Sequence, residues 1–552
     1  MARDTAPSGA AAPVDGDLVP LVPRPRQPAD VPSRARPATA AGGAGAVAVS
    51  GRAGRVAGLL VIALGAIYLA RRTATLGGTS AIGYLFYAAE LVTYLAVGWT
   101  AVMTGRLRPG APRQAPPPVG TLDVFVTVCG EPAAMVERTL RFAIAIDYPH
   151  QTYVLNDGRI AGRKDWREID ALAVRLGVPC FTRVDGTPGK AGNLNHALAR
   201  TSGGAILTLD ADHLVVPDLG EQVVGYLRDP DVGFVCTAQR FDTGRLDVLN
   251  NAESMFYRSL QPAKDRDNAA FSCGNGTLYR RSALESVGGF SEWNIVEDVQ
   301  TSYELHSHGW SSVYHPVPIS IGTAPATAAV YAKQRLRWAM DSTRLLLFDN
   351  PLVKPGLTRW QRAHYLHTSL SPLLASVQVV FALGPVLSIV PRSQLASTGS
   401  QQEYLLFGLP YFAATLLFIA AYAGARAAPR TVSSVLFNSP IYLLALARVV
   451  SGYRPRSSGT TEKAFQPKVS LLVLPQIMLA AVLVFSIVFY AFDTRADRPV
   501  FALAWAGILL VALAGPLSSV SERRAAVERW QTPISGTIIL AITILSAWTF
   551  AH

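Results

Sequence analysis

The chain has 552 residues, enough for several domains, and half of them are hydrophobic while only 16% are charged. This composition is too apolar for an ordinary soluble protein. The net charge of +12 is explained by contact with anionic lipid rather than with nucleic acid, because no basic helix and no aromatic-basic RNA motif occurs.

Residues 1–50 are rich in Ala, Pro, Gly and Arg and show no apolar periodicity, so we expect a disordered tail. The first apolar run begins too late for a cleavable signal peptide. Seven long apolar runs follow, and most have the roughly 20 residues that a membrane-spanning helix needs. They cover residues 56–70, 79–104, 369–390, 404–425, 469–492, 500–520 and 534–550.

Basic residues near these runs indicate how the runs are oriented. The first run is preceded by Arg24, Arg26, Arg34, Arg36, Arg52 and Arg55, and the links 426–468 and 521–532 are also basic. We therefore expect a multi-pass plasma-membrane protein whose N-terminus and polar middle are cytoplasmic. Arg71 and Arg72 lie on the opposite side and contradict this pattern. The less continuous stretch 432–450 is predicted to be an interfacial helix rather than a crossing.

The polar middle alternates predicted strands with predicted helices. Strands are expected at 121–128, 153–156, 181–184 and 205–209, with helical stretches at 133–146, 165–176 and 189–200 between them. This alternation indicates an α/β domain built on a largely parallel sheet. The four cysteines all lie in this part, and their spacing matches no zinc site, so we expect reduced thiols.

Polar side chains stand where three of these strands end. They are Thr127 with Glu131, Asn156 with Asp157, and Asp210 with Asp212. Each group alone is explained by turn chemistry. Together, at one edge of a parallel sheet, they indicate a nucleotide site at which the two aspartates hold a hard cation. Lys190, at a glycine-rich helix start suited to phosphate, strengthens this interpretation.

Three further motifs follow downstream. Residues 270–281 resemble a strand interrupted by glycines, where backbone can approach a ligand. Glu297 and Asp298 stand at a predicted helix start, where acids are favoured by the helix dipole in any case. Gln334 and Trp338 share a helix face; the tryptophan is either a membrane-interface anchor or a platform on which a sugar stacks.

The motifs, taken in order, resemble the processive family 2 glycosyltransferases, and most closely the bacterial cellulose synthase catalytic subunits. The resemblance covers residues 121–520. It rests on the series Asn156-Asp157-Gly158, Lys190-Ala191-Gly192-Asn193, Asp210-x-Asp212, Phe271-x-Cys273-Gly274, Glu297-Asp298 and Gln334-x-x-Arg337-Trp338.

The resemblance implies a GT-A glycosyltransferase domain, residues 105–348, inserted in an α-helical transmembrane bundle. Two spans (residues 51–104) would precede the domain, and a channel region of about five spans (residues 349–552) would follow it. A gating-type loop at 454–468 would close over the nucleotide.

The family also implies a role for each motif residue. Asp298, with Glu297 beside it, would be catalytic, Asp298 as the general base. Mg²⁺ or Mn²⁺ would bind to Asp210 and Asp212. The acceptor sugar would contact Trp338, Cys273 and Gly274. The nucleotide sugar would contact Thr127, Glu131, Asn156, Asp157, Lys190, Asp210, Gln334, Arg337, Thr461 and Lys463.

The expected function is polymerisation of a cellulose-like β-glucan from UDP-glucose and its translocation across the membrane. The expected partners are the UDP-sugar, the nascent polysaccharide, the lipid membrane and accessory exopolysaccharide proteins. Three alternatives remain: UDP-N-acetylglucosamine or mixed donors, a non-processive lipid-linked sugar transferase, and an inactive sensing or transport protein.

The sequence departs from the family at three points. Asn156 stands where a first aspartate is common, which affects the region near uracil. The segment Ala339-Met340-Asp341 replaces the usual Ala-Arg-Gly and alters the acceptor side. A cyclic-di-GMP receptor domain is not expected in this chain.

Overall fold

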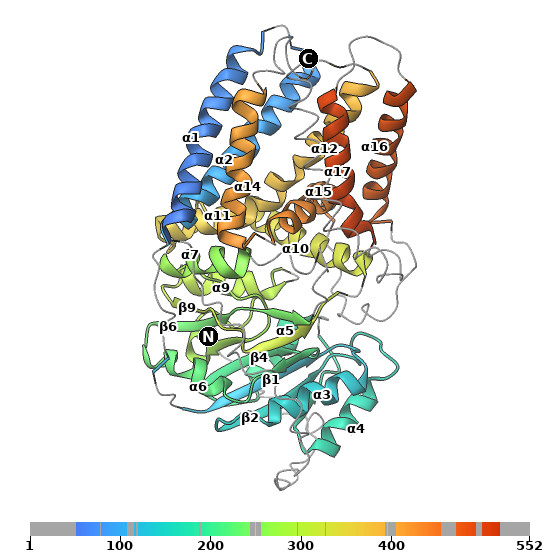
Figure 1. Cartoon of the computed structure of the whole chain (residues 1–552). Coiled ribbons are helices and arrows are strands. Elements are labelled where there is room, and N and C mark those ends of the chain that lie inside the picture. Colours follow the sequence, from blue (N-terminus) through green and yellow to red (C-terminus); the bar gives the residue numbers. More distant parts are fainter. Residues whose placement is uncertain are drawn as a thin grey trace, which may run out of the picture.

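The computed structural model describes residues 51–518 apart from 78, 108–114, 117–119, 187–188, 243–248, 250–254, 295, 326, 392, 394, 396–403, 426, 454–470 and 493–499. A bundle of long helices is stacked on an α/β domain (Figure 1). The predicted N-terminal tail, the gating-type loop at 454–468 and the apolar run at 534–550 lie outside the described residues.

A seven-stranded sheet forms the centre of the α/β domain, in the order β3-β2-β1-β4-β8-β6-β9. Strand β8 runs antiparallel to both of its neighbours, and the other neighbouring pairs are parallel. The predicted α/β class is confirmed. The strands are β1 (Leu122–Val128), β2 (His150–Asn156), β3 (Cys180–Thr182), β4 (Ala205–Asp210), β6 (Val232–Thr237), β8 (Thr277–Arg280) and β9 (Ser311–His315).

The register of the sheet brings the predicted polar groups to one edge. Thr127 pairs with Asp210 across β1 and β4, and Val128 pairs with Asn156 across β1 and β2. Because parallel strands start and finish together, the polar residues that follow them gather on the same side. The predicted convergence of strand ends is confirmed.

Helices cover both faces of the sheet because side chains alternate along each strand. Val124 and Val126 of β1 pack with α3 (Ala133–Ile144) and α4 (Trp166–Leu176) on one face. Phe125, between them, packs on the other face with α5 (Lys190–Leu198) and with residues of α8 (Arg281–Ser286) and α9 (Glu297–Ser307). Shorter helical pieces are α6 (Leu219–Val223), η3 (Val224–Arg228), η4 (Phe256–Leu260) and α7 (Gln261–Arg266).

A second, three-stranded sheet lies beside the carboxyl end of β4. Its order is β5 (His213–Val215), β10 (Ser320–Thr323) and β7 (Arg240–Asp242). Strand β5 starts directly after Asp212, so this small sheet fixes the chain at the point where it leaves the main sheet.

Seven helices among the described residues are long and apolar enough to cross a membrane. Two precede the α/β domain and five follow it, so the predicted multi-pass arrangement is confirmed. The candidate spans are Arg52–Ala74 in α1 (Gly51–Ala74), Ala81–Gly105 (α2), Arg359–Ile389 (α11, Arg359–Ser376, with α12, Gln378–Ile389), Leu405–Ala423 (η5, Tyr404–Gly408, with α14, Leu409–Ala423), Ala428–Val450 (α15), Leu474–Phe492 (α16) and Val500–Leu517 in α17 (Val500–Ser518).

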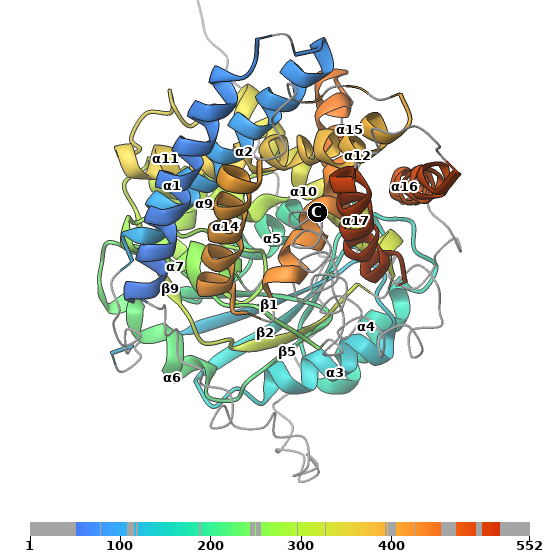
Figure 2. The same ribbon diagram turned by 45° about the horizontal axis from the view of Figure 1, so that its top comes forward.

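One of the candidate spans was not predicted as a span from the sequence. Helix α15 has the length and composition of a span, although we predicted an interfacial helix there. Figures 1 and 2 show α15 beside α10 (Ala328–Phe348), at the junction of the bundle and the α/β domain. Tyr331 of α10 contacts Ser434 of α15, with 3.2 Å between their hydroxyl oxygens.

Arg72, one of the two arginines that contradict the charge pattern, is paired with Glu90 of α2. Arg72 Nε donates to Glu90 Oε2 at 3.0 Å, and both residues are buried. Tyr68 donates to the other carboxylate oxygen. The carboxylate of α2 therefore neutralises the arginine of α1 that contradicted the orientation pattern.

Candidate active site

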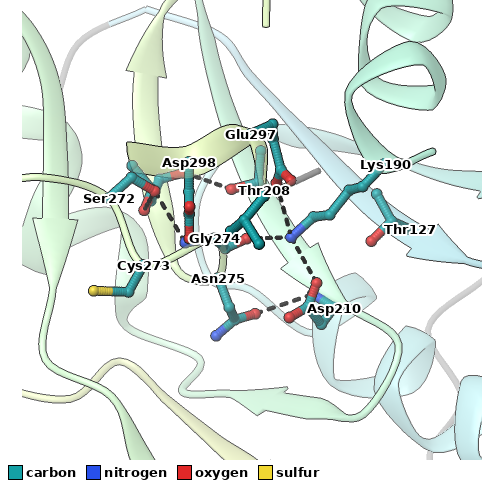
Figure 3. A network of polar contacts seen from close by, with 12 residues as sticks. Thr127, Lys190, Thr208, Asp210, Ser272, Cys273, Gly274, Asn275, Glu297 and Asp298 are labelled. Carbon is teal, nitrogen blue, oxygen red and sulfur yellow. Dashed lines mark hydrogen bonds and ion pairs between the residues drawn. The ribbon is translucent and has the colours of Figure 1, made fainter. Parts of the chain in front are cut away.

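Lys190 is the centre of the polar network at the sheet edge (Figure 3). Its Nζ donates to Asp210 Oδ1 at 2.7 Å and to the backbone oxygen of Gly274 at 2.5 Å. Glu297 Oε1 lies 3.3 Å from the same nitrogen. Three motifs that are far apart in the sequence thus meet at one ammonium group.

The charge of Lys190 is fixed by its neighbours. Burial by itself would lower the pKa of this lysine, but the carboxylates of Asp210 and Glu297 raise it above its ordinary value. Lys190 therefore carries a positive charge in this network. The position follows from the local sequence, because Lys190 is the first residue of α5, directly after Gly189.

Gly274 allows the glycine-rich loop to approach the acidic pair. Its φ angle is +82°, and a Cβ atom there would lie 2.9 Å from Asp298 Oδ2 and 3.4 Å from Lys190 Nζ. Any side chain would be strained and would crowd both groups. The neighbouring Asn275 accepts from the backbone N–H of Asp210 at 3.0 Å, which attaches this loop to the end of β4.

Asp298 is a buried carboxyl group in the first turn of α9. Only 6% of it is exposed, and its Oδ1 accepts from the backbone N–H of Val299 at 2.6 Å. Burial and then the charge of Glu297 raise its pKa to about 8, while Lys190 acts in the opposite direction. A carboxyl group with a pKa near neutrality is suited to general acid–base chemistry.

Asp210, Asp212 and His213 could together hold a metal ion. Each offers one ligand atom, and these atoms lie within 4.8 Å of one another. His213 Nδ1 is 3.2 Å from Asp212 Oδ1, and the ring is buried against Phe241. Two carboxylates and an imidazole fit a divalent cation.

The charge balance of the site also favours a cation. Asp210 and Glu297 both pair with Lys190, and Asp298 lies close enough to act on its charge. A divalent ion at Asp210 and Asp212 would offset negative charge that is costly in a partly buried site.

The predicted nucleotide residues on β1 and β2 have partners in the protein. Thr127 donates to the backbone oxygen of Leu209 at 3.2 Å, and Glu131 accepts from Cys129 N at 2.6 Å. Asp157 receives two hydrogen bonds of 2.7 Å from Arg183, and a longer one from Gly189 N. Asp157 is thereby joined to the loop that carries Lys190.

Asn156 differs from the others because it is completely buried. Its amide donates to Trp166 O at 2.9 Å and to Asp170 Oδ1 at 2.8 Å, and its oxygen accepts from Gly158 N at 2.9 Å. The residue that departs from the family pattern therefore connects β2 to α4 and shapes the turn that presents Asp157.

Helix α10 carries the predicted acceptor and pyrophosphate residues Gln334, Arg337 and Trp338, all partly buried. The guanidinium of Arg335 lies 4.5 Å from the ring centres of both Trp338 and Tyr331. Among the described residues, Arg337 Nε is buried and has no hydrogen-bond partner. Such a donor is available to an anionic ligand.

Cys273 is partly buried, and its backbone oxygen accepts from Gln239 at 2.8 Å. The described part of the chain does not include Thr461 and Lys463, so their predicted contact with phosphate stays a prediction. The residues that meet in one network are Lys190, Asp210, Gly274, Glu297 and, against Gly274, Asp298.

Sequence reasoning missed three residues of this region. His213 follows Asp212 directly, and that adjacency was an available signal for a third metal ligand. Arg183, the partner of Asp157, and Asn275, which is bonded to Asp210, stand next to predicted motifs but carry no pattern of their own.

Comparison with known proteins places these motifs in a family context. Residues 117–341 match the family described as "Glycosyltransferase like family 2", and residues 287–419 match "Cellulose synthase". These two matches confirm the resemblance predicted from the motifs.

Two curated relatives carry the name cellulose synthase catalytic subunit (UDP-forming). The one from Pseudomonas fluorescens is 31% identical over 392 residues, which are 67% of this chain and 49% of the relative. The one from Komagataeibacter sucrofermentans is 31% identical over 317 residues, which are 55% and 39% of the two chains. The chain thus spans about half the length of these relatives or less.

Among solved structures, a distant likeness is to the mannosyltransferase PcManGT from Pyrobaculum calidifontis in complex with GDP-Man and Mn²⁺. It is 21% identical with a TM-score of 0.44, and the match covers 62% of this chain and 97% of that one.

Proposed function

The chain is a glycosyltransferase related to family 2 and to cellulose synthase catalytic subunits, and from this we propose that it polymerises a β-glucan from UDP-glucose. We further propose that it is processive, inverts the configuration at the transferred sugar, and moves the polymer across the membrane in which its helices lie. The observation that carries the proposal is the buried Asp298 facing the Gly274 loop beside the Lys190–Asp210 pair.

The reaction follows from the positions of these groups. The acceptor hydroxyl attacks the anomeric carbon of the donor, the bond from that carbon to the diphosphate breaks, and UDP leaves with the electron pair. Asp298 receives the proton of the attacking hydroxyl. General-base assistance of this kind contributes about 10² to 10⁴ in rate.

The departing diphosphate needs positive charge. Lys190 supplies one permanent cation, and we propose that Arg337 on α10 supplies another through its buried Nε. A divalent ion held by Asp210, Asp212 and His213 would stabilise the same charge as a Lewis acid. The imidazole nitrogen in this group favours Mn²⁺ over Mg²⁺, which prefers oxygen ligands.

We propose that the membrane helices form the route for the product. The α/β domain is joined to α11, since His306 of α9 lies 2.7 Å from the Tyr365 hydroxyl and Lys264 donates to Thr368 at 2.8 Å. The helix that begins with Glu297 and Asp298 is thus anchored to a membrane helix. We propose that the site faces the cytoplasm, as the basic flanks predict.

Purified protein in detergent, supplied with labelled UDP-glucose or UDP-N-acetylglucosamine and Mn²⁺, tests this proposal. We expect a long polymer from UDP-glucose that a β-glucanase digests. Asp298→Asn should lower polymer synthesis at least about 10²-fold and keep UDP affinity within twofold. Polymer synthesis by that variant at the wild-type rate would contradict the assignment of Asp298. Transfer to a lipid without chain growth would contradict processivity.

A further inference from the structure

Asp341 lies on the same helix as the predicted acceptor residues, three positions after Trp338. Residues three apart lie on neighbouring points of one helix face. Its side chain is buried, with 6% exposed, although aspartate is rarely buried without a specific partner. The comparisons and the proposed mechanism give it no role.

The carboxylate of Asp341 holds the segment that leads into the catalytic pair. Its Oδ2 accepts from the backbone N–H of Val296 at 3.0 Å. Its backbone oxygen accepts from the Asn294 amide at 3.2 Å. One turn further along α10, Arg344 Nε donates to Asn294 Oδ1 at 2.9 Å. Two consecutive turns of α10 are therefore hydrogen-bonded to Asn294 and Val296, directly before Glu297 and Asp298.

Asp341 adds an acceptor from a neighbouring helix at the N-terminus of α9. Val296 is the N-cap residue, and its apolar side chain forms no cap hydrogen bond. Within the first turn, Asp298 accepts from Val299 N–H. A carboxylate near a helix N-terminus is favourable because of the helix dipole. The same place already holds Glu297 and Asp298, so a third carboxylate is repelled by the others and raises the pKa of Asp298 further. A neutral acceptor would hold the loop at a lower electrostatic cost.

We propose that Asp341 is a positioning residue that sets the distance between the general base and the acceptor sugar. Trp338 and Asp341 are on one rigid helix, and Asp341 is bonded to the segment that carries Asp298. The platform for the acceptor and the base that deprotonates it therefore move as one unit. This inference rests on the proposed function, because it assigns Asp341 a part in the same transfer.

The test compares Asp341→Ala and Asp341→Asn in the full chain in detergent. Asp341→Ala removes the acceptor for Val296 N–H, and we expect kcat to fall about 10- to 100-fold, since a misplacement near 1 Å has this effect. The donor KM and the affinity for UDP with Mn²⁺ should stay within twofold, because Lys190 and Asp210 are untouched. Asp341→Asn keeps an acceptor oxygen, so kcat should recover to within about threefold of the wild type.

Asp349→Ala is the matched control. Asp349 follows the last residue of α10, and its carboxylate accepts from Gln300 of α9 at 3.0 Å and from Lys354 at 3.1 Å, both of which follow the catalytic pair in the chain. We expect its kcat within twofold of the wild type.

Three results would overturn the inference. They are unchanged kcat in Asp341→Ala, an equal loss in Asp341→Asn, or an equal loss in Asp349→Ala. If Asp341→Ala does not fold, as thermal unfolding would show, Asp341→Leu takes its place: it fills a similar volume without an acceptor for Val296 N–H, and an unchanged kcat there would overturn the inference. A wild-type protein that transfers no sugar would instead overturn the proposed function.

Discussion

Burial favours the neutral form of the Asp298 carboxyl group, whereas its proposed role as a base needs the ionised form. It is buried next to another carboxyl group, yet the proposed reaction needs it ionised before it can accept a proton. Burial and Glu297 raise its pKa to about 8, and Lys190 limits the rise. Activity should therefore depend on pH in the range where the enzyme works.

The rate against pH offers a direct check. In the ligand-free enzyme, kcat/KM should increase with pH up to about 8, because only the ionised form of Asp298 is a base. Glu297→Gln removes the neighbouring negative charge, so the pKa of Asp298 should fall and the rising limb should move about one unit to lower pH. Initial rates between pH 5 and 9 measure the shift. A limb that stays in place or moves to higher pH would contradict the assignment of Asp298 as the base.

The position of His213 beside Asp210 and Asp212 depends on its contact with Gly322. A Cβ atom on Gly322 of β10 would lie 2.1 Å from His213 Nε2, so only glycine leaves room for the ring. His213→Ala should raise the Mn²⁺ concentration for half-maximal activity at least about tenfold, the scale seen when metal-site partners are lost.

Gly322→Ala should have the same effect, because it displaces the imidazole without altering it. Titration of Mn²⁺ at saturating donor measures both variants. The exposed His308, replaced by alanine, is the control and should leave the titration unchanged. A normal titration in His213→Ala would show that the two aspartates hold the ion without the imidazole.

At the scale of elements, local patterns predicted β1, β2, β3, β4 and part of β8, but not the other strands and not which strands pair. Strands β1, β2 and β4 were predicted from apolar runs that end in polar turns, and their parallel register brings Thr127 next to Asp210. The stretch 270–281 was predicted as an interrupted strand, and only Thr277–Arg280 is one. Residues 272–276 form the glycine loop, because two positive φ angles there are incompatible with a strand.

Helix α15 shows a second limit of local reasoning. Its sequence contains Asn438, Pro440 and Arg448, which led to the prediction of an interfacial helix. In the structure Asn438 is buried and donates to Tyr331 of α10, so its polarity serves a helix contact. A polar residue such as Asn438 fits either an interfacial helix or a contact between buried helices. The sequence cannot show which, because the contact depends on Tyr331, a residue of another helix.

At the scale of the whole molecule, the pair of Arg72 and Glu90 joins the first two membrane helices. Glu90 neutralises Arg72, and Arg72 also donates to Leu395 O at 3.2 Å. The positive-inside pattern counts arginines whether or not they are paired, so Arg72 remains an exception to the predicted orientation. The pair explains how a buried arginine is tolerated between the two helices.

Glu90→Ala should be strongly destabilising, because it leaves a buried guanidinium without its partner. Removal of one member of a buried pair costs about 3–5 kcal/mol. Thermal unfolding in detergent should show a large loss for Glu90→Ala and a smaller loss for the double variant with Arg72→Ala. Arg71→Ala, which removes an exposed charge, is the control. A double variant less stable than Glu90→Ala would show that the pair itself contributes little.

The place of β8 in the sheet has a consequence for folding during synthesis on the ribosome. Strand β8 lies between β4 and β6 but is made after both, so β4 and β6 lack this shared neighbour until residue 280 is synthesised. At about 5–20 residues per second, the edge of β4 waits roughly 4–14 s for its partner. During that time its unpaired backbone groups can bind another strand. The membrane helices α1 and α2 are already made, and their insertion would hold the incomplete domain at the membrane, away from other unfinished copies.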